Sequence, residues 1–114
     1  MLSIPGTITI YLHTQPTDLR KGADALCGVI RGQFQGDPQD GSLFLFFNRR
    51  RDRVKMLHWD GTGYWVYYKT LESGTFESVA SSEPRVQIDS LQLAMLLGGI
   101  SLQTARRKRY ARVA

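Results

Sequence analysis

The sequence has little cysteine, little histidine and no long apolar run. Of its 114 residues, one is a cysteine, Cys27, and two are histidines, His13 and His58. A single cysteine excludes an internal disulfide, and these three residues lack the spacing of a zinc site. No stretch approaches the roughly 18–20 apolar residues of a membrane-spanning helix, and the first residues lack the pattern of a secretory signal. We therefore expect a cytoplasmic protein with no membrane contact, no metal and no cofactor.

Catalytic motifs are also missing from the sequence. It contains neither a phosphate-binding loop nor the glycine-flanked serine of hydrolases. Four acidic residues, Asp18, Asp52, Asp60 and Glu72, could in principle hold magnesium in a nuclease. Each has a simpler explanation, as a helix start, a salt bridge or a turn former. We expect a binding protein rather than an enzyme.

Acidic residues are absent from the end of the chain, where basic residues gather. Residues 1–104 hold ten Lys/Arg and ten Asp/Glu, which cancel, so the net charge of +5 lies in the last ten residues. Those cations are Arg106, Arg107, Lys108, Arg109 and Arg112. A second cluster, opposed only by Asp52, consists of Arg49, Arg50, Arg51, Arg53 and Lys55. We expect one α+β domain over residues 1–104 and a flexible basic tail over residues 105–114.

Two segments have the pattern of helices. After an alternating strand at residues 8–12, Thr17 is the expected N-cap of a helix whose apolar stripe runs from Leu19 to Phe34. Near the end of the domain, Asp89 and Gln92 have the spacing of a capping box before the apolar run 90–97. That helix is apolar almost all round.

The middle of the sequence predicts strands joined by tight turns. The expected strands are residues 43–47, 53–59, 64–69, 75–77 and, at an edge, 86–88. The segment from Asp60 to Gly63 is a strong hairpin signal. Together these patterns predict an α+β fold, with an antiparallel β-meander of four to five strands packed against two helices on one face.

The two basic clusters are candidate nucleic-acid-binding sites. If all five tail cations met phosphates, the logarithm of the binding constant would fall with the logarithm of salt concentration with a slope of about −4. Alternatively, the tail is merely a solubilising end. The arginines at residues 49–53 indicate a turn that binds a phosphate backbone. Local ion pairs, or binding to an acidic protein surface, would also explain them.

Apolar and aromatic side chains give a second set of candidates, for partner binding. They are Leu93, Leu96 and Leu97 in the second helix and Trp65 and Tyr67 in an aromatic strand. Exposed aromatics beside a basic turn would resemble a stacking platform for single-stranded nucleic acid. The competing interpretation for both elements is burial in the core.

Several motifs resemble one known family. They are Thr17-Asp18-Leu19-Arg20-Lys21-Gly22-Ala23-Asp24, Leu43-Phe44-x-Phe46, Arg49-Arg50-x-Asp52-Arg53-x-Lys55-x-Leu57-x-Trp59-Asp60-Gly61-x-Gly63, Lys69-x-Leu71-Glu72-x-Gly74-x-Phe76 and Leu91-x-x-Ala94-Met95-Leu96-Leu97-x-Gly99-Ile100. From about residue 4 to the tail, the chain resembles the TnpB-type accessory proteins, encoded by the second reading frame, of the IS66 group of bacterial insertion sequences.

The resemblance implies an element in which a separate, larger protein is the transposase and this small protein assists transposition. On that basis we expect binding of element DNA, near its ends, through the two basic clusters. The alternative is an adaptor that docks on the transposase or on another accessory protein of the element. As family-motif residues, the resemblance marks Asp18, Arg20, Lys21, Trp59, Asp60, Gly61 and Glu72.

Overall fold

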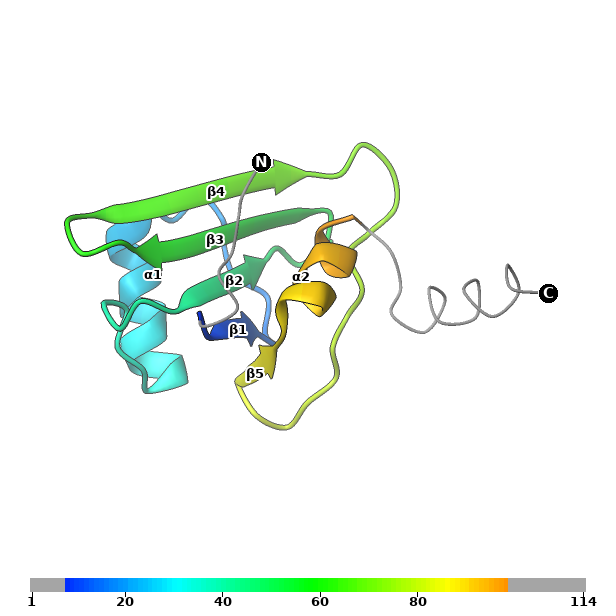
Figure 1. Ribbon diagram of the computed structural model, residues 1–114. Helices are drawn as coiled ribbons and strands as arrows, with labels where there is room; N and C mark the ends of the chain where they lie inside the picture. Colours follow the sequence, from blue (N-terminus) through cyan, green and yellow to red (C-terminus); the bar gives the residue numbers. More distant parts are fainter. Residues whose placement is uncertain (1–7, 99–114) are drawn as a thin grey trace.

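The computed structural model describes residues 8–98, which form one five-stranded sheet and two helical segments (Figure 1). The strands are β1 (Ile10–His13), β2 (Leu43–Phe47), β3 (Arg53–Trp59), β4 (Tyr64–Thr70) and β5 (Arg85–Ile88), in the order β4-β3-β2-β1-β5. The helices are α1 (Ala23–Val29), continued by a π-helical segment η1 (Ile30–Phe34), and α2 (Ser90–Leu97). The predicted α+β class is confirmed.

The sheet is mixed rather than wholly antiparallel. β2, β3 and β4 follow one another and pair antiparallel, so the predicted meander is confirmed for these three strands. β1, however, pairs parallel to β2, and β5 pairs antiparallel with β1. The prediction of four to five meander strands is wrong at β1, because the segment that joins β1 to β2 contains α1 and crosses over the sheet.

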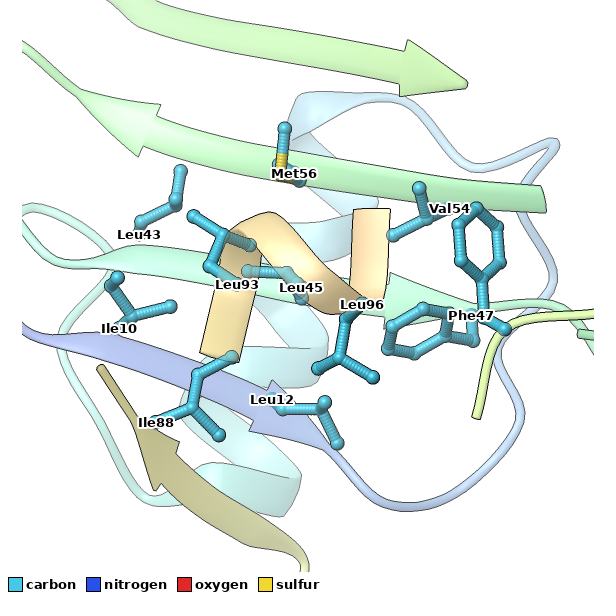
Figure 2. Packing of buried hydrophobic residues seen from close by; sticks show 11 residues of the cluster. Ile10, Leu12, Leu43, Leu45, Phe47, Val54, Met56, Ile88, Leu93 and Leu96 are labelled. Atoms are coloured by element: carbon cyan, nitrogen blue, oxygen red, sulfur yellow. The ribbon is translucent and has the colours of Figure 1, made fainter. Parts of the chain in front are cut away.

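The two helical segments cover opposite faces of the sheet, although the sequence predicts both on one face (Figure 1). On one side, the stripe of α1 and η1 packs on Phe44, Phe46 and Leu57. On the other side, α2 packs on the alternate strand residues, among them Leu45 and Met56 (Figure 2). Because both faces are covered, all five residues of β2 are buried, as predicted for a central strand.

The first helix begins later than the sequence predicts. Thr17 does not cap it, because the Thr17 amide donates to the carbonyl of Phe47 over 2.8 Å and so ties this segment to the end of β2. Asp18 accepts from the Arg20 amide in a local turn, and the N-cap is Gly22 in an extended conformation. The predicted apolar stripe is confirmed as helical from Ala23 to Phe34, where η1 ends with a buried side chain, whereas Leu19 packs in the same cluster from the turn before the helix.

The capping box and the hairpin are both confirmed. The side chain of Asp89 accepts from the amide of Gln92, and the side chain of Gln92 accepts from the amide of Asp89. At the β3–β4 turn, Gly61 has φ +103°, a conformation that residues with a side chain rarely adopt. Within residues 8–98, no helix has the length and hydrophobicity needed to cross a membrane.

Residues 75–77 do not form the predicted strand. Phe76 is buried against Phe47, with ring centroids 5.4 Å apart, and its amide donates to the carbonyl of Arg51 over 2.6 Å. The buried ring and this backbone hydrogen bond therefore hold the segment against the β2–β3 turn without a ladder of strand pairing. The predicted edge strand at residues 86–88 is confirmed as part of β5.

Candidate nucleic-acid interface

The turn between β2 and β3 is held by Asn48 and presents the arginine cluster. The Asn48 side-chain oxygen accepts from the amides of Asp52 (3.1 Å) and Arg53 (3.0 Å). Its side-chain nitrogen donates to the Asp52 carboxylate over 2.7 Å. This hydrogen bond is the main cause of the lowered pKa of Asp52, and the positive charges of Arg50 and Arg53 lower it further. The turn is thus fixed by its own polar groups, and the side chains of Arg49, Arg50 and Arg53 are exposed on it.

Arg51 is the member of the cluster that turns toward the protein. Its guanidinium donates to the carbonyl of Phe76 over 3.2 Å and to the carbonyl of Glu77, and it stacks 4.4 Å from the centre of the Phe47 ring. Burial lowers the pKa of this arginine. The backbone of Arg51 is left-handed, with φ 58°, and this conformation accompanies the inward position of its side chain. Arg51 fastens residues 76–77 to the turn and is not part of the outward-facing set.

The other three arginines of the turn, Arg49, Arg50 and Arg53, are exposed and line one open pocket of about 450 Å³. In the part of the chain that the structure describes, none of the three forms an ion pair with a carboxylate. The remaining lining residues come from two other segments and from the turn itself, and are Pro16, Thr17, Asp18, Leu19, Arg20, Asn48 and Tyr68. We call this cavity the basic pocket.

Two of the family-motif residues before α1, Asp18 and Arg20, form part of one wall of the basic pocket, whereas Lys21 does not line it. The Arg20 guanidinium donates to both carboxylate oxygens of Asp18, at 2.8 Å for the shortest contact. These hydrogen bonds, with the Arg20 amide, lower the pKa of Asp18 to about 2. The hydrogen bond from the Thr17 amide to Phe47 fixes this wall to the end of β2. The sequence did not predict that Arg20 joins the arginine turn, because the two segments are about 30 residues apart.

Lys55 and Tyr68 lie on the sheet, at the side of the basic pocket that β3 and β4 form. They are paired across β3 and β4, and the Lys55 ammonium lies 5.4 Å from the centre of the Tyr68 ring. The same ammonium donates to the carbonyl of Lys21 over 2.9 Å. Lys55 is therefore beside the basic pocket without lining it, whereas Tyr68 lines it with 54% of its surface exposed.

The local charge of the pocket differs from that of the domain. Its lining contains Arg20, Arg49, Arg50 and Arg53 against the single acid Asp18, which gives 4 − 1 = +3. Residues 8–98 as a whole hold ten basic and ten acidic side chains, which cancel. A concave basic surface on a neutral body is suited to an anionic ligand, and arginine guanidinium groups match phosphate oxygens in geometry.

The Trp-Asp-Gly motif has a structural role. The Asp60 carboxylate accepts from the amides of Thr62 and Gly63 and from the indole nitrogen of Trp65, at 2.8–3.0 Å. These bonds lower the pKa of Asp60 to about 2. Trp59 is half-buried, with its ring 4.9 Å from that of Tyr64. The motif therefore shapes the turn of the β3–β4 hairpin, and none of its three residues lines the basic pocket.

Two of the predicted partner-binding residues belong to the core. Leu93 and Leu96 are 3% and 0% exposed and pack against the sheet beneath α2 (Figure 2), while Leu97 is half-buried at the edge of that cluster. The prediction of a leucine docking surface is wrong for Leu93 and Leu96, because the helix uses these side chains to cover the sheet. Exposed apolar surface instead lies at Leu91 (59%) and Trp65 (54%), and Trp65 stacks on the half-buried Tyr67.

Other candidate residues are isolated or lie elsewhere. Within residues 8–98, no three His, Cys, Asp or Glu side chains come together in a group that could hold a metal ion. Cys27 is a buried residue of α1, and His13 is buried with hydrogen bonds to the carbonyl of Pro84 and the side chain of Gln33. Glu72 is exposed. The five predicted tail cations, Arg106, Arg107, Lys108, Arg109 and Arg112, lie outside the described residues.

Comparisons with known proteins match nearly the whole chain. A family model described as "IS66 Orf2 like protein" matches residues 8–107. The "Uncharacterized protein y4jC" of Sinorhizobium fredii is 30% identical over 101 residues, which are 89% of this chain and 86% of that protein. The "Uncharacterized protein y4hO" of the same strain is 30% identical over 100 residues, 88% of this chain and 87% of that protein. No solved structure matches the chain significantly.

Proposed function

Because the chain belongs to the family of IS66 Orf2-like proteins, we propose that it assists transposition of an insertion sequence by binding the element's DNA, and that it performs no chemistry itself. The family supports the accessory role. The observation that supports DNA as the ligand is the basic pocket, which Arg49, Arg50 and Arg53 line without forming an ion pair among the described residues.

Phosphate is the part of DNA that this arrangement fits. The backbone of the turn that carries the three arginines is already held by Asn48 before binding, so only the arginine side chains need to be ordered against a phosphate backbone. Arg20 adds a fourth guanidinium, although part of its hydrogen-bonding capacity is used by Asp18. The five cations of residues 105–114 supply further phosphate contacts in this proposal.

Fluorescence anisotropy with a labelled duplex from the element's end tests the proposal. We expect Arg49→Gln/Arg50→Gln to weaken binding strongly. The matched control, Arg31→Gln/Arg85→Gln, removes the same charge from exposed residues that do not line the pocket and should weaken binding less. Removal of residues 105–114 should cost further affinity. Equal losses from both double variants, or no binding by the full chain at low salt, would overturn the proposal.

A second candidate function is an adaptor that docks on the transposase or another accessory protein of the element. It is favoured by the exposed apolar side chains of Trp65 and Leu91. Trp65 is paired with His58 across β3 and β4 and lies on the α2 side of the sheet, whereas Tyr68 and the pocket lie on the α1 side. The two surfaces are thus separate.

Co-purification from cells that express the whole element tests the adaptor function. An interaction that survives high salt and nuclease treatment, and is lost with Trp65→Asp or Leu91→Asp, would support it. Substitution at Leu93 is unsuitable for this test, since that side chain is in the core. Co-purification that disappears after nuclease treatment would instead show that DNA bridges the two proteins, and would count against the adaptor.

A further inference from the structure

The basic pocket contains one feature that phosphate contacts alone do not explain, an aromatic ring among its arginines. Tyr68 is 54% exposed on an edge strand and lines the pocket with Arg49, Arg50 and Arg53. The Lys55 ammonium lies over the ring, 5.4 Å from its centre, in a cation–π contact. An aromatic side chain kept at the surface beside several cations is the combination that stacks a nucleic-acid base next to its phosphates.

The size and lining of the pocket also favour an unpaired nucleotide over a duplex. Its volume of about 450 Å³ lies in the range of about 300–1,000 Å³ typical of pockets that enclose small ligands. The bases of a duplex are stacked on one another, so a duplex backbone lying across the pocket would leave the Tyr68 ring without a stacking partner. An unpaired base presents a free face, and Pro16 and Leu19 supply further apolar lining.

We propose that the basic pocket binds one unpaired nucleotide of DNA, with its base stacked on Tyr68 and its flanking phosphates held by Arg49, Arg50 and Arg53. This inference rests on the proposed function and makes it more specific. It places the protein where single-stranded DNA is exposed, such as an overhang or an opened end of the element. Duplex DNA still binds through the basic surface, but without the contribution of stacking.

Three labelled DNAs of equal length distinguish these modes of binding by the full chain: a single strand, a blunt duplex and a duplex with a short single-stranded overhang. At matched salt, the single strand and the overhang should bind more tightly than the blunt duplex. Stacking of a base on an aromatic side chain contributes about 1–3 kcal/mol, so Tyr68→Ala should weaken single-strand binding by about 5- to 150-fold. Tyr68→Phe should keep the affinity, and neither variant should change duplex binding.

Trp65→Ala is the matched control, because Trp65 is as exposed as Tyr68 and lies on the other face of the same strand. It should leave single-strand binding unchanged. A second measurement needs no variant: 2-aminopurine in the overhang should lose fluorescence on binding, as it does when stacked. The nucleotide pocket is overturned if the fluorescence of 2-aminopurine is unchanged and Tyr68→Ala either has no effect or weakens binding of all three DNAs equally. Arginine-dependent duplex binding would then still stand, and only absence of all DNA binding would overturn both.

Discussion

Arg50 and Arg51 are neighbours in the sequence, yet their guanidinium groups lie in different surroundings. Arg50 lines the basic pocket, whereas Arg51 donates to the carbonyls of Phe76 and Glu77. The sequence predicts a cluster of arginines at this turn but does not show which one faces inward. That depends on the left-handed backbone at Arg51 and on acceptors 25 and 26 residues further along the chain.

This difference predicts unequal effects for two adjacent substitutions. Arg51→Ala removes two hydrogen bonds from a charged donor and the stacking of the guanidinium on the Phe47 ring, so we expect a loss of about 2–4 kcal/mol in the free energy of unfolding. Arg50→Ala removes no ion pair within the described residues and should change stability by less than about 0.5 kcal/mol. Urea unfolding followed by circular dichroism measures both. Equal stability of the two variants would contradict the structural role of Arg51.

At the β3–β4 turn, Asp60 predicts a dependence of stability on pH. Its pKa is lowered from 3.8 to about 2 by the amides of Thr62 and Gly63 and by the Trp65 indole, so the folded chain favours the ionised carboxylate. The stabilisation is present above pH 3.8 and is lost as the pH falls toward 2. The unfolding temperature of the wild type should therefore fall more between about pH 5 and pH 2 than that of Asp60→Ala.

Asp18 is the control for this pH series, because its pKa is also lowered to about 2, by Arg20, in a different part of the fold. Asp18→Ala should keep the part of the pH dependence that comes from Asp60. Tryptophan fluorescence in a Trp59→Phe background reports on Trp65 alone and gives a local readout, since the Trp65 indole donates to the Asp60 carboxylate. An identical fall in unfolding temperature in the wild type and in Asp60→Ala would show that the Asp60 hydrogen bonds do not stabilise the hairpin.

Among the secondary-structure elements, local patterns predict much more than long-range pairings do. The capping box at Asp89, the apolar stripe ending at Phe34 and the hairpin turn at Asp60 all depend on residues within a few positions of one another, and the structure confirms each. The sequence does not predict the parallel pairing of β1 with β2 or the start of α1. Both depend on interactions between distant segments, such as the hydrogen bond from Thr17 to the end of β2.

Helix α2 gives the clearest element-scale prediction, because its neighbouring leucines differ in burial. Leu96 is 0% exposed in the cluster beneath the helix, so Leu96→Ala should cost about 2–5 kcal/mol in the free energy of unfolding. Leu91→Ala, at an exposed position of the same helix, should change stability by less than about 0.5 kcal/mol. Denaturant unfolding of both variants measures the difference. A cost below about 1 kcal/mol for Leu96→Ala would contradict the placement of this helix face in the core.

For the whole molecule, the important feature is the position of the basic pocket on a domain whose acidic and basic side chains otherwise cancel. The sequence predicts the arginine turn as a binding element, but the pocket itself depends on the folding together of residues 16–20, the β2–β3 turn and Tyr68 on β4. No local pattern contains this information, because 28 positions separate Arg20 from Asn48 and 15 separate Arg53 from Tyr68. The fold thus converts three ordinary surface segments into one concave basic site.

The salt dependence of DNA binding by the full chain and by Arg49→Gln/Arg50→Gln/Arg53→Gln tests this account most directly. Removing one arginine–phosphate interaction should reduce the slope of the logarithm of the binding constant against the logarithm of salt concentration by about 0.7–0.9. We therefore predict that the slope of the triple variant is smaller in magnitude by about 2–3, with unchanged stability. A slope equal to that of the wild type would show that these three arginines do not bind phosphates, and would contradict the central claim.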